Sequence, residues 1–227
     1  MFWECKNLTT LPQLDISNGT NFQNMFTSCI NLTTIPQLDT SNGTNFQSMF
    51  MNCMKLTTIP QLNVSKGTNF EDMFWYCNNL TTIPQLNTSN GTNFSGMFYY
   101  CTNLSSILQL DTSKGTDFSY MFYNCTSLTT LPQLNVSNGI YFGGMFGLDT
   151  TTGCTSLTTI SFVENCIGAN ISFKYCDALS HDSLISILNG LKTVTSTRTC
   201  TLGATNLAKL TDEEKAIATQ KNWTLAS

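Results

Sequence analysis

Cysteine and histidine are the side chains of this sequence best suited to covalent or metal chemistry. The chain has 10 cysteines but a single histidine, His181. A cysteine nucleophile needs a base and an orienting third group, and a zinc site needs three or four protein ligands. No CxxC pair occurs, and nothing in the sequence gives Cys176, just before the histidine, a reactive partner. We therefore expect no catalytic residue, no metal site and no cofactor.

Most of the cysteines follow a strict period. Six of them lie 24 residues apart: Cys5, Cys29, Cys53, Cys77, Cys101 and Cys125. Because free cysteine behaves as a small buried apolar side chain, we expect this ladder to face the core. The other four fall outside the period, and a disulfide among them stays open: Cys154, Cys166, Cys176 and Cys200.

The carboxylates are few and do not form a constellation for acid–base work. One repeat position alternates between aspartate and asparagine: Asp15, Asp39, Asp111, Asn63, Asn87 and Asn135. A position that accepts both residues is not expected to act as a catalytic acid or base. The recurring SNGT and SKGT glycines are typical of turns rather than of a phosphate-binding loop. We expect that the protein is not an enzyme.

Charge and hydropathy exclude two classes of partner. Charged residues make up 11% of the sequence, the net charge is −4, and no Lys/Arg cluster exists. Neither nucleic-acid binding nor attraction to anionic lipids is therefore expected. No apolar run approaches the ~20 residues of a spanning helix, so we expect no membrane insertion of this fragment.

The elements that position these residues follow from the 24-residue period, which also carries a Met-Phe pair in each unit. A period of this size predicts a solenoid with one supersecondary unit per coil. The last unit is interrupted, because FGLDTTTGC replaces FxxC before Cys154. The additional residues are expected to bulge as a loop.

Within one unit, Phe22, Met25, Phe26 and Cys29 fall at i, i+3, i+4 and i+7. This spacing predicts a two-turn helix, and Thr20 with Gln23 has capping-box spacing. The following LTTIPQL predicts a short parallel strand that ends by the recurring proline, and DTSNGT predicts a turn.

The phrases LxxIPxL and MFxxCxxL together resemble the BspA-like leucine-rich repeats over roughly residues 1–160. The resemblance implies an α/β solenoid, a leucine-rich-repeat-like right-handed coil with short parallel strands and short helices. Members of that family are similar to bacterial cell-surface adhesins and host-interaction proteins, and comparable repeats decorate phage tail proteins.

Residues 161–227 depart from the period, and we expect them to form a C-terminal α/β cap, which a solenoid needs. SHDSLISILNGL predicts a helix, TCTLG a strand, and the capping box of Thr211 and Glu214 a final helix. An extended piece follows from Trp223, and Phe173-x-x-Cys176 is a possible remnant coil.

At the other end, Met1 stands in register with the later Met-Phe pairs. We expect that the chain is the C-terminal portion of a longer protein, with an uncapped N-terminal coil. The alternative is a natural start at which Met1 fills the methionine column.

The variable positions of the repeat are the candidates for partner binding. The pairs beside Met-Phe change from coil to coil, and on a helix with its apolar stripe inward many of them should point outward. Large aromatic residues gather there, and they form the predicted ligand-binding set: Trp75, Tyr76, Tyr99, Tyr100, Tyr120 and Tyr123. The alternative is that these positions drift on a solvated face, or that the rings merely cover the edge of the core.

These features predict a non-catalytic extracellular recognition or adhesion module of a bacterial surface protein, binding a host or cell-surface protein or glycan. One alternative is the receptor-binding part of a phage tail fibre on the virion. Another is a structural spacer or fibre subunit that self-associates through its uncapped N-terminal coil. Recurring Thr-Thr pairs are similar to ice-binding surfaces, but adjacent strand residues point to opposite faces, so we expect one displayed threonine per coil.

Overall fold

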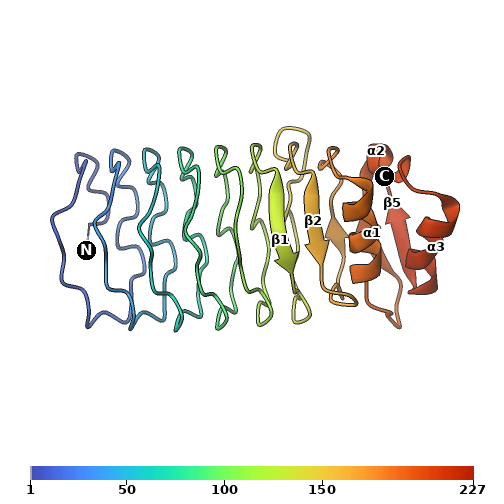
Figure 1. The fold of residues 1–227 in the computed structure, drawn as a ribbon, viewed down its shortest axis with the longest axis horizontal. Coiled ribbons are helices and arrows are strands. Elements are labelled where there is room, and N and C mark those ends of the chain that lie inside the picture. The colour runs from blue at the N-terminus through green and yellow to red at the C-terminus, as the bar shows by residue number, and fades with distance from the viewer. Residues whose placement is uncertain (1) are drawn as a thin grey trace.

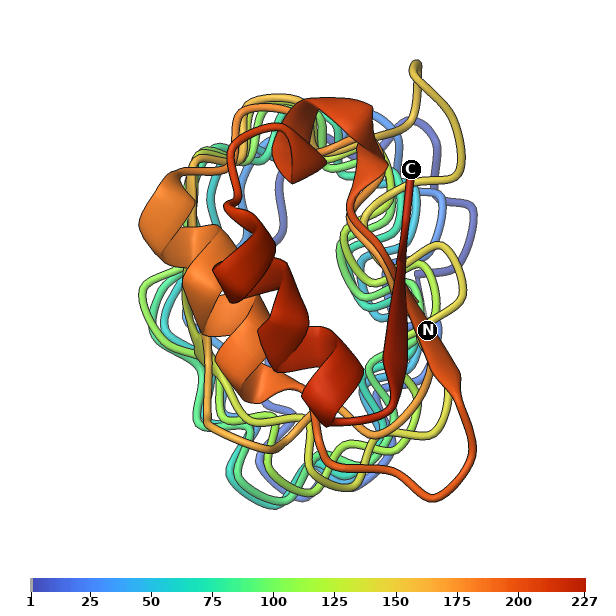
Figure 2. The same ribbon diagram turned by 90° about the vertical axis from the view of Figure 1, so that its right-hand side faces the viewer.

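The computed structural model describes residues 2–227, which wind into successive coils stacked along one long axis (Figure 1). Seen along that axis, each coil is an oval loop, and helices close the C-terminal end (Figure 2). Met1 lies outside the described residues, and with it the expectation that this residue fills the methionine column.

Regular elements are concentrated in the second half of the chain. Two parallel strands, β1 and β2, form one sheet, and β3, β4 and β5 form a second parallel sheet in that order. The elements are β1 Thr130–Leu134, β2 Thr159–Phe162, β3 Ile171–Ser172, α1 His181–Gly190, β4 Arg198–Thr201, α2 Gly203–Leu207, α3 Asp212–Gln220 and β5 Trp223–Ala226.

The helix expected in each coil is not formed, and that prediction was wrong. The Met-Phe segment is a run of turns whose backbone bonds reach the next coil: Phe26 N donates to Met49 O at 2.9 Å, and Ser28 N donates to Met51 O at 2.7 Å. An α-helix would instead need each N–H to bond four residues back. The capping box predicted at Thr20 is also absent, because Asn21 Oδ1 accepts the hydrogen bond from Gln23 N at 3.0 Å.

The strand expected over LTTIPQL is regular only at β1 and β2. Elsewhere among the described coils the stacking in this segment rests on isolated contacts, such as Thr33 N donating to Thr9 O at 3.0 Å. β1 also continues through Pro132 instead of ending there. Proline lacks an N–H, and the register with β2 is irregular between Thr130 and Gln133, where that donor is missing.

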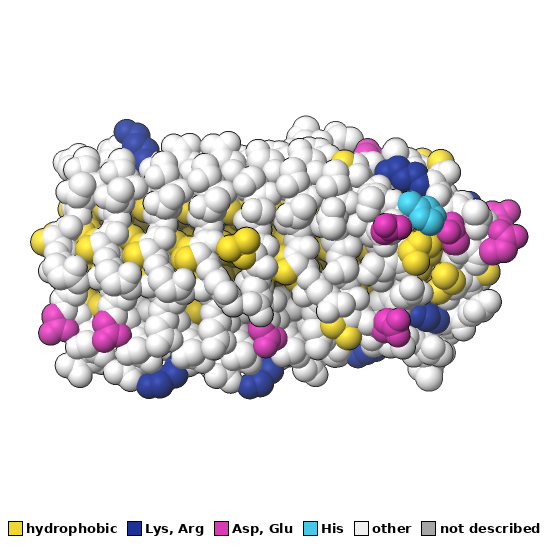
Figure 3. All heavy atoms as spheres, viewed as in Figure 1, with side chains coloured by type: hydrophobic (Ala, Val, Ile, Leu, Met, Phe, Trp, Pro, Cys, Tyr) yellow, Lys and Arg dark blue, Asp and Glu magenta, His cyan; other side chains and the backbone are white. Residues whose placement is uncertain are grey.

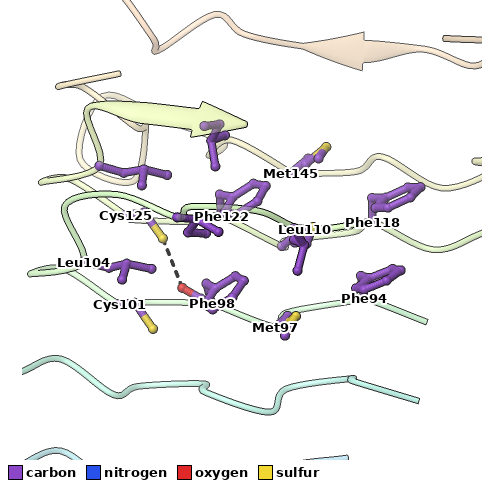
Figure 4. Close-up of a cluster of buried hydrophobic side chains, with 14 of the residues drawn as sticks. Phe94, Met97, Phe98, Cys101, Leu104, Leu110, Phe118, Phe122, Cys125 and Met145 are labelled. Carbon is purple, nitrogen blue, oxygen red and sulfur yellow. Dashed lines mark hydrogen bonds between the residues drawn. The ribbon is translucent and has the colours of Figure 1, made fainter. Parts of the chain in front are cut away.

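The core is built of columns of identical side chains, as the period predicts. Figure 4 shows Phe94, Met97, Phe98 and Leu104 directed into the interior of the stack. All four side chains have 0% exposure. Successive phenylalanine rings stack; Phe98, for example, lies 5.6 Å from the ring before it and 5.8 Å from the ring after it. Such pairs contribute beyond their buried area.

The C-terminal elements follow the sequence closely. Ser180 caps α1, and the predicted capping box of Thr211 and Glu214 caps α3. The remnant coil continues the core, because Phe173 stacks on Phe146 with ring centroids 4.8 Å apart. The sequence predicted β4 and β5 but not the short elements β3 and α2.

Candidate functional site

The structure brings all six predicted aromatic residues together on the Met-Phe side of the coils. We call this set the aromatic strip: Trp75, Tyr76, Tyr99, Tyr100, Tyr120 and Tyr123. Every ring of the strip has at least one other within 6.3 Å, centroid to centroid. Side chains from three successive coils therefore make one continuous surface feature.

The rings stack along the axis of the coils in two columns. Trp75 lies on Tyr99 with centroids 3.6 Å apart and planes 8° apart, and Tyr99 lies on Tyr123 at 4.6 Å. Tyr76 lies on Tyr100 at 4.5 Å. The ring faces inside each column are thus covered by neighbouring rings. What remains for a partner is mainly ring edges and hydroxyl groups, and Tyr120 is the most exposed member at 40%.

The backbone beneath the strip is unusual for bulky residues. Tyr76, Tyr100 and Tyr120 have φ values of 57°, 58° and 57°. This is the left-handed region, which costs a residue with a side chain roughly 1–2 kcal/mol and suits glycine or asparagine better. The equivalent positions of other coils hold smaller residues with the same sign of φ: Glu4, Asn24, Ser28, Ser48, Asn52, Asp72, Gly96, Asn124 and Gly144. The conformation is therefore common to the coils, whereas the tyrosines are particular to this region.

Many of the variable positions were expected to point outward, and several do not. Thr27, Ser48 and Asn124 are buried, at 7%, 6% and 9% exposure. Thr27 Oγ1 donates to Ser48 O at 2.6 Å, which ties neighbouring coils together. The segment runs as alternating turns rather than as a helix, so a helical wheel does not describe which positions face out.

One carboxyl group borders the strip. Burial, and secondarily the neighbouring Glu71, raise the pKa of Asp72 to about 7. A Cβ built on Gly96 would lie 2.1 Å from Asp72 Oδ1 and 2.8 Å from Trp75 Cε3, so the absence of a side chain there leaves room for both groups. Within the strip itself, burial raises the pKa of Tyr99 to about 12. Tyr99 accordingly presents a neutral hydroxyl group at physiological pH.

The predicted insertion loop adjoins the strip and was not foreseen as part of it. Residues 147–153 project sideways from the oval outline of the coils (Figure 2). Asn124 N donates to Thr152 O at 2.8 Å, and Leu148 is 55% exposed. Burial raises the pKa of Tyr100, and the neighbouring Tyr76, Tyr123 and Asp149, in that order, raise it further. The signal in the sequence was the interruption of the period directly after the aromatic coils.

The cysteine ladder faces the core from Cys29 to Cys125, as predicted, and each of these five thiols donates to a backbone carbonyl. Cys101 Sγ donates to Phe74 O at 3.1 Å and Cys125 Sγ to Phe98 O at 3.1 Å (Figure 4). Cys154, although outside the period, repeats this contact with Phe122 O at 3.0 Å. All ten cysteines are unbridged in the structure, including the four whose pairing the sequence left open.

We expect these thiols to be inert in the folded protein. Burial raises the pKa of Cys77 to about 12, so almost no reactive thiolate exists at neutral pH. A disulfide-exchange reagent should modify at most Cys5, which is only half-buried, in native protein, and all ten thiols in denaturant. Fewer than ten reactive thiols in denaturant without reductant would contradict the unbridged assignment.

His181 takes part in a contact within the cap. Its Nε2 lies 2.9 Å from Glu214 Oε1, which joins α1 to α3. The structure does not bring it to Cys176, which is buried among core residues. Among residues 2–227, no group of three or more His, Cys, Asp or Glu side chains is placed to hold a metal ion.

Both threonines of the Thr-Thr pairs are exposed, so the expectation of one displayed threonine per coil was wrong. Thr33 and Thr34, for example, are both exposed because this segment is not a pleated strand. The first hydroxyl of the pair is used within the stack: Thr33 Oγ1 donates to Thr9 O at 3.1 Å. These columns therefore help to hold neighbouring coils together.

The model of a family described as a Mycoplasma protein of unknown function, DUF285, matches residues 1–104 and again residues 55–157. No curated protein matches the chain. Among the described residues, no helix is long and apolar enough to cross a membrane.

Proposed function

Because the chain belongs to the DUF285 family of repeat proteins, we propose that it is a non-catalytic recognition module of the BspA-like type. Its stack of coils would be a right-handed leucine-rich-repeat-like solenoid of residues 1–160, closed by the cap of residues 161–227. Its place would be outside the cell, on a bacterial surface, where it adheres to a host or cell-surface partner through the aromatic strip.

The observation that carries this proposal is the backbone of the strip. Tyr76, Tyr100 and Tyr120 occupy left-handed positions at which other coils have small residues. Asparagine or glycine would hold the same conformation with less strain. Residues in strained backbone conformations cluster at functional sites, where the surrounding structure holds them in place. A strained residue is therefore an observation from which a function can be inferred. Tyrosine at three of these positions is thus better explained by a partner than by folding.

The geometry favours a protein partner for the strip. Tyrosine and tryptophan supply large, rigid contact area with a polar edge, and they are enriched at binding hot spots. A sugar ring needs an open aromatic face to stack on, but Trp75 and Tyr99 cover each other at 3.6 Å. Ring edges and hydroxyl groups spread over three coils suit the broader surface of a protein.

The test is the double substitution Tyr76→Asn and Tyr100→Asn. Both positions belong to a column that holds Asn52 and Asn124 in other coils, so asparagine is compatible with the backbone. Binding to immobilised extracellular-matrix proteins and to cultured epithelial cells should fall by roughly tenfold or more, because hot-spot aromatic residues contribute about 2 kcal/mol or more each.

The matched control is Leu108→Asn, which removes a 75% exposed apolar side chain on the Thr-Ile-Pro-Gln side of the coils. This variant should bind as the parent protein does. Unchanged binding of the folded tyrosine double variant, or binding of the parent protein to none of these probes, would contradict the proposal.

A further inference from the structure

A groove on the Thr-Ile-Pro-Gln side of the coils lies apart from the aromatic strip. It has a volume of about 810 Å³ and runs across three successive coils. Leu38, Leu62 and Val64 lie beneath it with 1%, 1% and 0% exposure, so polar side chains supply most of its accessible surface. Figure 3 shows this side of the molecule, with an apolar row between polar columns and acidic side chains along its lower edge.

One wall of the groove is a row of glutamine side chains with fixed orientation. Gln37 Nε2 donates to Gln61 O at 2.6 Å, and Gln61 Nε2 donates to Gln85 O at 2.6 Å. Each Nε2 also lies near the carbonyl of the following leucine, at 3.4 and 3.3 Å. With their amide hydrogens held this way, these side chains present the oxygen Oε1 to a ligand as an acceptor.

A second row of lining side chains, two residues further along each coil, offers donors at the same spacing. Asn63 Oδ1 accepts a hydrogen bond from Ser65 N at 3.2 Å, and Asn87 Oδ1 accepts one from Ser89 N at 3.2 Å. These bonds fix the amide planes. Within the described part of the chain, neither Nδ2 has a hydrogen-bond partner, so both remain available as donors.

From this arrangement we infer that the groove binds a neutral linear polysaccharide lying along the axis of the coils. A row of acceptors beside a row of donors matches hydroxyl groups, which both donate and accept. The polar pattern repeats with each coil, roughly 5 Å along the axis, a length scale comparable to one sugar unit.

Two other ligand classes fit less well. An anionic polymer would meet Asp39, whose pKa is lowered by hydrogen bonds from Ser41, so that it stays ionised. An extended peptide binds by adding a strand to an open backbone edge. The lining of this groove presents side-chain amides, and the coils direct their backbone bonds along the stack instead.

The test uses Asn63→Asp with Asn87→Asp. The same column holds Asp39 with an equivalent bond to Ser41 N at 3.0 Å, so aspartate keeps the turn while replacing an amide donor by an acceptor. The probes are neutral linear hexasaccharides of glucose, mannose and xylose, with their disaccharides and anionic hyaluronan for comparison. Binding is measured by isothermal titration calorimetry.

We expect at least one neutral hexasaccharide to bind, and its disaccharide to bind more weakly because fewer coils are engaged. The double variant should lose roughly tenfold in affinity. Asn135→Asp, a change in the same column outside the groove, should have no effect. The tyrosine variant of the strip should also bind normally, which separates this site from the proposed function.

Three results would overturn the inference: no binding of any neutral hexasaccharide, equal loss of binding in the Asn135→Asp control, or a preference for hyaluronan. Thermal melting of each variant shows whether a loss of binding reflects the groove or the fold.

Discussion

Replacing Phe98 by alanine should lower the free energy of unfolding by about 3–5 kcal/mol, the range for truncating a buried aromatic residue. The side chain is fully buried and stacks on a phenylalanine ring on each side. In a stack of coils, each unit is stabilised only by its neighbours, so a cavity in one coil weakens two interfaces. The change is measured as a shift of the urea midpoint.

Leu108→Ala is the matched control for this prediction. It also removes a large apolar side chain from the same part of the chain, but Leu108 is 75% exposed. Its effect should stay within about 0.5 kcal/mol, as for other surface substitutions. If the two variants lost stability equally, the rings of the column would not hold the coils together.

Asp72→Asn should stabilise the protein at neutral and alkaline pH. The pKa of Asp72 is raised from 3.8 to about 7, first by burial and then by Glu71. Between these values the folded chain keeps a proton that the unfolded chain has released. Unfolding therefore releases a proton, and stability falls as pH rises from about 4 to about 7.

The asparagine variant should lack this decline. A shift of this size corresponds to about 4 kcal/mol for a fully buried group. Because the carboxyl is partly exposed, solvent reduces the expected gain to about 1–3 kcal/mol at pH 8. At pH 4 the variant and the parent protein should be equally stable. The measurement is a series of urea titrations from pH 4 to pH 8.

Asp39→Asn should change stability in the opposite direction and serves as the control. Hydrogen bonds from Ser41 lower the pKa of Asp39 in the folded protein. The ionised carboxylate therefore stabilises the fold at pH values above the pKa of the unfolded chain, and this stabilisation is lost as pH falls. Removing it should make the variant less stable near neutrality and equal to the parent protein in acid. A gain in the Asp72 variant that did not change with pH would contradict the assigned protonation.

The candidate site was partly predictable. The six aromatic residues stand out because the repeats form their own alignment, in which the packing columns are constant and the neighbouring pairs vary. What the alignment does not contain is how the rings lie. Trp75 and Tyr99 stack face to face at 3.6 Å, which turns separate exposed rings into a column of edges. The groove was not predicted, because its glutamines belong to constant columns that need no functional explanation in a sequence.

The sequence by itself determined which side chains share a column and which columns are buried. A fixed period of 24 places Phe98 over Phe74 and Cys125 over Cys101, whatever path the backbone takes between them. It also determined α1, α3 and their caps, whose signals are local: a capping residue, an apolar stripe and a partner three residues on.

Only the tertiary structure decided the backbone conformation inside each coil. The spacing of Phe22, Met25, Phe26 and Cys29 fits a helix, yet Phe26 N donates to Met49 O in the next coil. A two-turn helix is unstable without tertiary support, and here the neighbouring coil offers partners for the same N–H groups. Those partners lie 23 residues away, so no local sequence pattern predicts them. The left-handed positions that carry the tyrosines arise because hydrogen bonds to the neighbouring coil replace those of a helix.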